Sequence, residues 1–106
     1  MECTHEYWRS NGQFVPNVTL RLASGGYIGG GLYHSQNLEG ALATLPGARI
    51  VCPSFADDAA GLLRTSIRSR GFTLFIEPKA LYNSVEAAAI VPDDFEQHRF
   101  RKLKNQ

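Results

Sequence analysis

The residue best suited to chemistry in this sequence is His34, which follows a run of glycines. Five of the seven residues from Gly25 to Gly31 are glycine, and His34 lies just before a stretch with helical spacing. An imidazole can donate and accept a proton near neutral pH, and ligands of open α/β sheets bind at strand-to-helix connections of this kind. His34 is therefore a candidate catalytic residue, although position alone favours a structural histidine about twofold.

The glycine run itself is a weaker signal than the histidine. Its spacing, Gly25-x-x-x-Gly29-x-Gly31, matches neither the dinucleotide-binding fingerprint nor a phosphate-binding P-loop. The next expected strand ends at Cys52 without the acidic residue that would bind a ribose. Nicotinamide binding is therefore not predicted, and the plain interpretation is a close backbone approach that needs residues without a Cβ atom.

Other residues that bind metals or form disulfides are sparse. The two cysteines, Cys3 and Cys52, are too few for a disulfide framework, and we expect Cys52, which lies in an apolar run, to be a buried free thiol. Cys3 and His5 together are too small a set for a metal site. His5 and His98 lie in polar terminal stretches without a catalytic context.

Length and composition predict one soluble, intracellular domain. The chain has 106 residues, of which 43% are hydrophobic and 20% are charged, and its formal net charge is +1. This composition is typical of a globular protein, and the balanced charge predicts no nucleic-acid or membrane partner. No stretch reaches about 18 apolar residues and the start of the chain is polar, so neither a membrane span nor a signal peptide is predicted.

The apolar pattern predicts strands that alternate with helices. Strands are expected at residues 17–22, 49–52 and 72–76, with helices at about 35–45 and from 54 to about 70. Ser35 and Ser54 are the expected helix caps, Ser10-Asn11-Gly12 is an expected turn, and residues 1–16 show little periodicity. Such an order is that of βαβ units. The predicted fold class is α/β, a mostly parallel sheet with flanking helices.

The residues around His34 also resemble a known family. The run Gly29-Gly30-Gly31-Leu32-Tyr33-His34-Ser35-Gln36 is similar to the glycine-rich segment and His-Ser-Gln motif of the beta subunits of pyruvate and branched-chain 2-oxo acid dehydrogenases. Collinear matches follow at Leu45-Pro46-Gly47, Arg49-Ile50-Val51-Cys52-Pro53, Ala59-x-Gly61-Leu62-Leu63 and Glu77-Pro78-Lys79-x-Leu81-Tyr82. The resemblance covers about residues 7–95 and leaves the basic tail 96–106 unassigned. It implies that residues 1–106 are a partial transketolase-like pyrimidine-binding domain.

This resemblance implies chemistry based on thiamine diphosphate. In the family, a 2-oxo acid substrate is decarboxylated with that cofactor, and the acyl group is transferred reductively to lipoyl groups of an acyltransferase core. The histidine that matches His34 lies in the active site and helps the reductive acylation step. The alpha subunit supplies the diphosphate and magnesium motif, and a second beta subunit is the other implied partner. The implied compartment is the cytoplasm of a bacterium or the mitochondrial matrix of a eukaryote.

The resemblance further implies a structural monovalent cation, usually potassium, held by main-chain carbonyls. The matching positions are Val18, Ser66, Ile67, Ser69 and Gly71. Unpaired carbonyls at a helix C-terminus are suitable cation ligands. Family members often have an Asp-Pro-Asn-Pro-like stretch where this chain has Ser69-Arg70-Gly71-Phe72, so Arg70 adds a positive charge at this place.

One glutamate that the family uses has no match in this sequence, and this changes the activity that we expect. The family's glutamate that bonds the cofactor's aminopyrimidine ring lies well upstream of the histidine, and Glu2 and Glu6 have no matching context. We therefore expect a fragment of a beta subunit that is inactive alone and whose active site other chains complete. Two alternatives stay open: a non-catalytic remnant or partner-binding module of the same fold, and another thiamine enzyme of the transketolase group. The residues that contact the cofactor and the choice of 2-oxo acid are not predicted.

Overall fold

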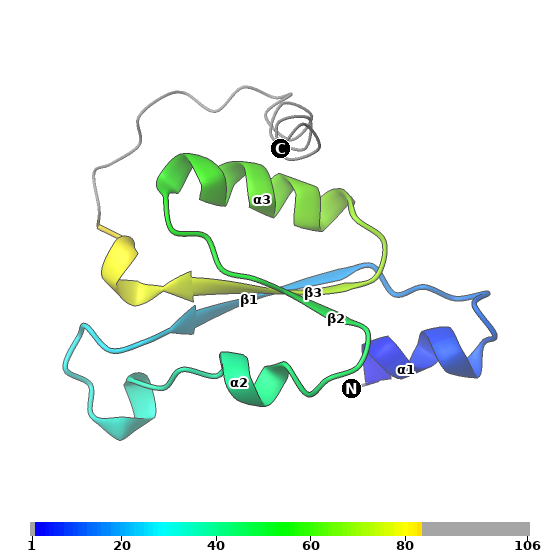
Figure 1. Cartoon of the computed structure of the whole chain (residues 1–106), viewed down its shortest axis with the longest axis horizontal. Helices are drawn as coiled ribbons and strands as arrows, with labels where there is room; N and C mark the ends of the chain where they lie inside the picture. The colour runs from blue at the N-terminus through cyan, green and yellow to red at the C-terminus, as the bar shows by residue number, and fades with distance from the viewer. Residues whose placement is uncertain (1, 84–106) are drawn as a thin grey trace, which may run out of the picture.

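The computed structural model describes residues 2–83 as a parallel sheet with helices on both faces (Figure 1). The elements are, in chain order, α1 (Glu2–Arg9), β1 (Val18–Ser24), the 3-10 turn η1 (Leu32–His34), α2 (Glu39–Leu42), β2 (Ala48–Val51), α3 (Ala56–Arg68), β3 (Phe72–Pro78) and the 3-10 turn η2 (Lys79–Leu81). The predicted α/β class is confirmed. The basic tail 96–106 lies outside the described residues.

The strand order is β1-β3-β2, with β3 in the centre and both pairings parallel. β1 pairs with β3 along its whole length, from Val18 opposite Phe72 to Ser24 opposite Pro78. The carboxyl ends of the strands therefore lie at one edge of the sheet, where the β1–α2 connection meets the β3–η2 corner. Within residues 2–83, no helix is long and apolar enough to cross a membrane.

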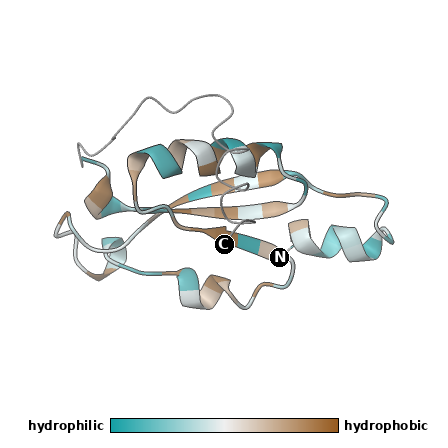
Figure 2. Cartoon of the chain, turned by 45° about the horizontal axis from the view of Figure 1, so that its top comes forward, coloured by the Kyte–Doolittle hydropathy of each residue, from teal (hydrophilic) through white to brown (hydrophobic). Residues whose placement is uncertain are grey.

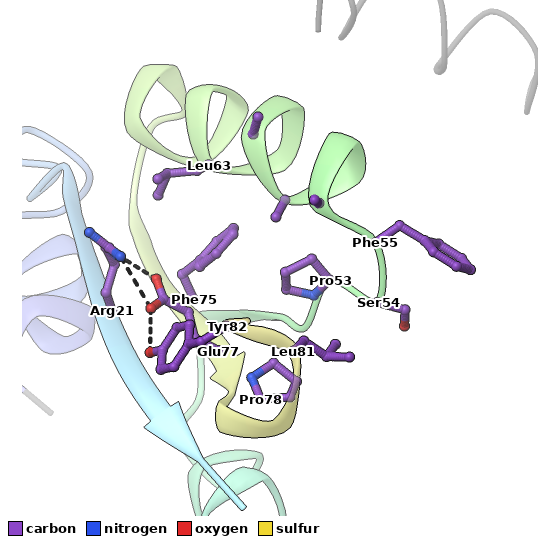
Figure 3. Close-up of a pocket in the computed structure, with 13 residues that line it drawn as sticks. Arg21, Pro53, Ser54, Phe55, Leu63, Phe75, Glu77, Pro78, Leu81 and Tyr82 are labelled. Carbon is purple, nitrogen blue, oxygen red and sulfur yellow. Dashed lines mark hydrogen bonds and ion pairs between the residues drawn. The ribbon is translucent and has the colours of Figure 1, made fainter. Parts of the chain in front are cut away.

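The core is built on β3 because its side chains alternate between two covered faces. Phe72, Leu74 and Ile76 point to the α1 and α2 face, and Leu74 and Ile76 are only 1% exposed. The side chains packed against them are Cys3, Leu22, Leu42, Leu45, Ala48 and Ile50. Phe75 points instead toward α3 (Figure 3). Hydrophobic residues are accordingly concentrated in the strands, while helices carry hydrophilic residues (Figure 2).

The two predicted helices begin later than their predicted caps. The stretch expected to be one helix from Ser35 is split into η1 and a single turn of α2, whose N-cap is Leu38. Residues 35–38 stay irregular because the Gln36 carbonyl accepts a hydrogen bond of 2.9 Å from Gly25 N–H, which holds this segment beside the end of β1. Similarly, α3 follows the extended residue Phe55 and has no side-chain cap, so Ser54 does not cap it.

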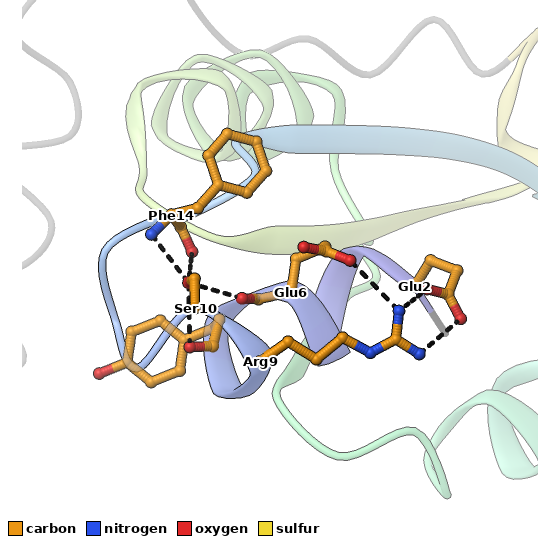
Figure 4. A network of polar contacts seen from close by, with 6 residues as sticks. Glu2, Glu6, Arg9, Ser10 and Phe14 are labelled. Carbon is orange, nitrogen blue, oxygen red and sulfur yellow. Dashed lines mark hydrogen bonds and ion pairs between the residues drawn. The ribbon is translucent and has the colours of Figure 1, made fainter.

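The helix α1 is absent from the sequence-based prediction. Its exposed side chains are joined by polar contacts: Arg9 Nη1 contacts Glu2 Oε2 at 2.6 Å and Glu6 Oε1 at 3.3 Å (Figure 4). The Ser10 hydroxyl donates to the Glu6 carbonyl at 2.7 Å and accepts from Phe14 N–H at 2.9 Å, which ends the helix. The turn predicted after it is confirmed.

The expected burial of Cys52 is wrong. β2 ends one residue earlier, at Val51, so Cys52 lies in the connection to α3 and is exposed. The other free thiol, Cys3, is half-buried and packs against the core from α1.

Candidate functional site

His34 is the last residue of η1, on the connection between β1 and α2. This connection lies at the carboxyl edge of the sheet (Figure 1). Its side chain is exposed. Its backbone N–H donates to the Gly31 carbonyl at 3.3 Å, and its own carbonyl accepts a hydrogen bond from the Lys79 ammonium group. Because Lys79 directly follows β3, this bond links the backbone of His34 to the end of the most buried strand of the sheet.

The glycine-rich loop is closed at its base by the end of β1. The buried Ser24 hydroxyl lies 2.6 Å from Glu39 Oε1 and 3.3 Å from Asn37 Oδ1. The hydrogen bond from Ser24, followed by one from the backbone N–H of Glu39 itself, lowers the pKa of the Glu39 carboxyl. The glycine-rich loop therefore begins at Ser24, and the residues that follow it lie beside Ser24 again.

Glycines allow the imidazole of His34 to lie against the backbone of the loop. A Cβ atom at Gly30 would lie 2.7 Å from His34 Cβ and 2.9 Å from Cδ2 of its ring, closer than real contacts allow. Gly29 and Gly31 have φ angles of 67° and 71°, which side chains with a Cβ atom rarely adopt. The predicted close backbone approach is thus confirmed, and it places one face of the imidazole.

Substituting Gly30 with alanine is expected to displace the His34 side chain without unfolding the domain. Gly30 does not have a positive φ, so its backbone tolerates alanine and only the contact with the ring must change. The test is the NMR shift of the His34 ring protons together with a urea unfolding curve. We expect the ring signals to move while stability changes by roughly 0.5 kcal/mol or less, as at surface sites. Unchanged ring signals would contradict this packing.

A cavity of about 300 Å³ lies between α3 and the β3–η2 corner, also at the carboxyl side of the sheet (Figure 3). Its lining is largely apolar and comes from the β2–α3 connection, the first half of α3, and the end of β3. The lining residues are Arg21, Pro53, Ser54, Phe55, Ala56, Ala59, Ala60, Leu63, Phe75, Glu77, Pro78, Leu81 and Tyr82.

One end of this cavity carries an ion pair. The Arg21 guanidinium contacts the Glu77 carboxylate through two nitrogens, with Nη2 at 3.1 Å from Oε2, and the Tyr82 hydroxyl donates to Oε2 at 2.7 Å. The Arg21 hydrogen bond holds the pKa of the Glu77 carboxyl below its usual value, against the opposing effect of partial burial, and the Tyr82 hydrogen bond adds to this lowering. The same contact raises the pKa of Tyr82. Glu77 is thus an ionised, fully engaged group rather than a free base.

Because the folded-state pKa of Glu77 is lowered, its contribution to stability is present above the ordinary carboxyl pKa of about 4.3 and is lost as pH falls through the folded value. We expect the free energy of unfolding to fall with acidification across this range, and to fall less steeply in Glu77→Gln. Urea unfolding between pH 7 and pH 3 measures this. The control is Glu2→Gln, which alters an exposed pair on α1. Identical pH profiles for wild type and Glu77→Gln would contradict the assignment.

The residues expected to hold a monovalent cation meet at the opposite edge of the sheet, where α3 ends and β3 begins. Val18 N–H donates to the Gly71 carbonyl at 3.2 Å, and the Ser66 carbonyl accepts from Ser69 N–H at 3.3 Å. The fifth residue, Ile67, lies in the last turn of α3. The structure brings this set together, and cation binding there stays a prediction. Residues 2–83 contain no group of three His, Cys, Asp or Glu side chains that could hold a metal ion.

Two long-range contacts, one at His34 and one at the cavity, could not be predicted from the sequence. Lys79 was recognised only as part of a motif, and its bond to His34 joins residues 45 positions apart. The Arg21–Glu77 pair spans 56 positions. The alternation in β1 does place Arg21 on the face opposite Leu22, but neither partner could be paired without the strand order.

The fold of this chain is consistent with the family that comparisons with known proteins identify. Residues 5–85 match the family described as the transketolase, pyrimidine binding domain. The 2-oxoisovalerate dehydrogenase subunit beta of Bacillus subtilis is 38% identical over 88 residues, which are 83% of this chain and 27% of that protein. The mitochondrial protein of that name from Dictyostelium discoideum is 42% identical over 78 residues, 73% of this chain and 21% of that protein. The pyruvate dehydrogenase E1 component subunit beta of Staphylococcus aureus is 43% identical over 77 residues, 73% of this chain and 24% of that protein. The chain thus spans about a quarter of the length of these relatives.

Proposed function

The chain belongs to the transketolase pyrimidine-binding domain family, and we propose on that basis that it serves as part of a 2-oxo acid dehydrogenase beta subunit. In this role it takes part in the oxidative decarboxylation of a 2-oxo acid and the transfer of the acyl group to lipoyl groups. The observation that carries the proposal is the placement of His34, on a glycine-rich loop at the carboxyl edge of a parallel sheet. Ligands of open α/β sheets bind at this edge.

The contacts around His34 support a role in proton transfer. Its backbone is held by Lys79 and by the closed loop, and its ring lies on Gly30, so the imidazole is oriented although it is exposed. Because His34 is exposed, it is open to groups that another chain would supply. When bound, thiamine diphosphate would supply the carbanion chemistry, and His34 would give or take a proton during reductive acylation.

The described residues fit only part of a thiamine diphosphate site. An imidazole and an apolar cavity are present, but the carboxylate at that cavity, Glu77, is already bonded to Arg21 and Tyr82. It is therefore not available to bond an aminopyrimidine ring. This supports a site that groups outside the described residues complete. From the family we further propose an alpha subunit that carries magnesium and the diphosphate, a second beta subunit, and a lipoyl acyltransferase as acceptor. The cytoplasm or the mitochondrial matrix is the proposed location.

The direct test is turnover by the purified 106-residue chain. It is mixed with thiamine diphosphate, magnesium and a set of 2-oxo acids, and reduction of an artificial electron acceptor is followed. No turnover is expected from the chain alone, while a complete alpha–beta enzyme in the same assay serves as the positive control. Robust turnover without an alpha subunit would overturn the proposal that other chains complete the site.

A second candidate function, a non-catalytic module that binds a partner, is favoured by the exposed apolar residues of the loop. Leu32 and Tyr33 are 84% and 89% exposed, directly before His34. Such residues are typical of a surface that another protein covers. A binding module would keep its affinity for an alpha subunit after His34→Ala and lose it after Tyr33→Ser, and it would support no turnover in any combination.

A further inference from the structure

The corner where α3 ends and β3 begins is occupied by an arginine from the neighbouring strand. Arg49 belongs to β2, and its Nη2 atom donates a hydrogen bond to the Arg70 carbonyl. The same nitrogen lies beside Gly71, where an added Cβ atom would be 3.7 Å away. The guanidinium group therefore reaches the stretch of backbone in which a monovalent cation was expected.

Backbone carbonyls of this corner already have hydrogen-bond donors from the chain itself. The Gly71 carbonyl accepts from Val18 N–H at 3.2 Å, and the Ser66 carbonyl accepts from Ser69 N–H at 3.3 Å. On the other side of Gly71, its N–H donates to Asn17 Oδ1 at 2.9 Å. Each of these two carbonyls therefore has one of its two lone pairs engaged by a donor that is built into the fold.

The positive charge of Arg49 also disfavours a bound potassium ion at this corner. The C-terminal end of α3 carries the negative end of the helix dipole, which a cation stabilises. A guanidinium group is always charged and has five donors, so Arg49 supplies that cation permanently. A potassium ion a few ångströms from the same group would be repelled by it, because like charges at such distances interact strongly near a protein surface.

We propose that the Arg49 guanidinium takes the place of the monovalent cation in this chain, so that its fold does not depend on potassium. Arg49 itself lies in a run that resembles the family, so the disagreement with the implied cation site rests on the bond that its guanidinium makes to the Arg70 carbonyl. This inference concerns the stability of the corner alone, so it stands or falls independently of the proposed catalytic role of His34.

The test is thermal unfolding of the full chain, followed by circular dichroism. It is run in potassium chloride and in N-methylglucamine chloride at the same ionic strength, about 0.1 M, where surface charges are partly screened. The wild-type midpoint is expected to be the same in both salts. Arg49→Gln is expected to lower the midpoint by about 1–8 °C in N-methylglucamine chloride.

Arg70→Gln is the matched control, because it removes an equal charge from an exposed neighbour while leaving the Arg70 carbonyl in place. Its midpoint is expected to stay near that of wild type. If Arg49→Gln does not fold, Arg49→Lys keeps the charge and is expected to fold without potassium. Two results would overturn the proposal: a wild-type midpoint several degrees higher in potassium, or an Arg49→Gln midpoint equal to that of Arg70→Gln.

Discussion

Replacing His34 with alanine is expected to slow acyl transfer to lipoyl groups by about 100- to 10,000-fold, the usual range for loss of a positioned acid–base group. Since this chain spans about a quarter of its relatives, the substitution is made in a full-length Bacillus subtilis beta subunit whose matching segment is replaced by residues 5–85 of this chain. The measurement is the rate of lipoyl acylation after assembly with the alpha subunit.

His5→Ala is the control for this substitution, because His5 belongs to α1, which lies at the opposite end of the sheet from the β1–α2 connection that carries His34 (Figure 1). Its rate is expected to match the unsubstituted hybrid. Following an artificial electron acceptor in parallel separates decarboxylation from acyl transfer, and we expect the lipoyl reaction to suffer most. A His34→Ala hybrid that acylates lipoyl groups at the unsubstituted rate would remove His34 from the active site.

Replacing Leu74 with alanine is expected to destabilise the domain by about 2–5 kcal/mol. Leu74 lies in the central strand and is 1% exposed, so the lost methyl groups leave a cavity that neighbours on both sides cannot easily fill. Domains of this size are stable by only about 5–15 kcal/mol, so the loss is a large share of the total. Urea unfolding of the chain measures it.

Leu32→Ala is the control for the core substitution, because Leu32 is 84% exposed. Its free energy of unfolding is expected to stay within roughly 0.5 kcal/mol of wild type. Equal stability of Leu74→Ala and Leu32→Ala would show that β3 is not the centre of the core.

The strands could be predicted because their signal is local and apolar. The run from Phe72 to Ile76 is almost wholly hydrophobic, and this is the strand that the structure buries on both faces. The central place of β3 depends on pairing between residues far apart, which periodicity does not encode. The helix α1 could not be predicted for another reason: Cys3 is the one residue of α1 that packs against the core cluster, so no continuous apolar stripe marks this helix in the sequence.

The candidate site was predictable at one residue and not in its surroundings. His34 is conspicuous by type and by its place after the glycines, and its family motif could be read directly. The orientation of His34 depends on two contacts that only the three-dimensional structure reveals. Its ring lies against Gly30, and its carbonyl is bonded to Lys79. The start of α2 was misplaced for a related reason, because Gln36 bonds back to Gly25 instead of entering a helix.

The most direct test of the central claim is binding of the purified chain to the alpha subunit of a 2-oxo acid dehydrogenase, measured by pull-down and by size-exclusion chromatography. The full-length Bacillus subtilis beta subunit serves as the positive control. If this chain contributes one part of a shared active site, it co-elutes with the alpha subunit. An alpha subunit that binds the full-length control but leaves this chain unbound would contradict the account.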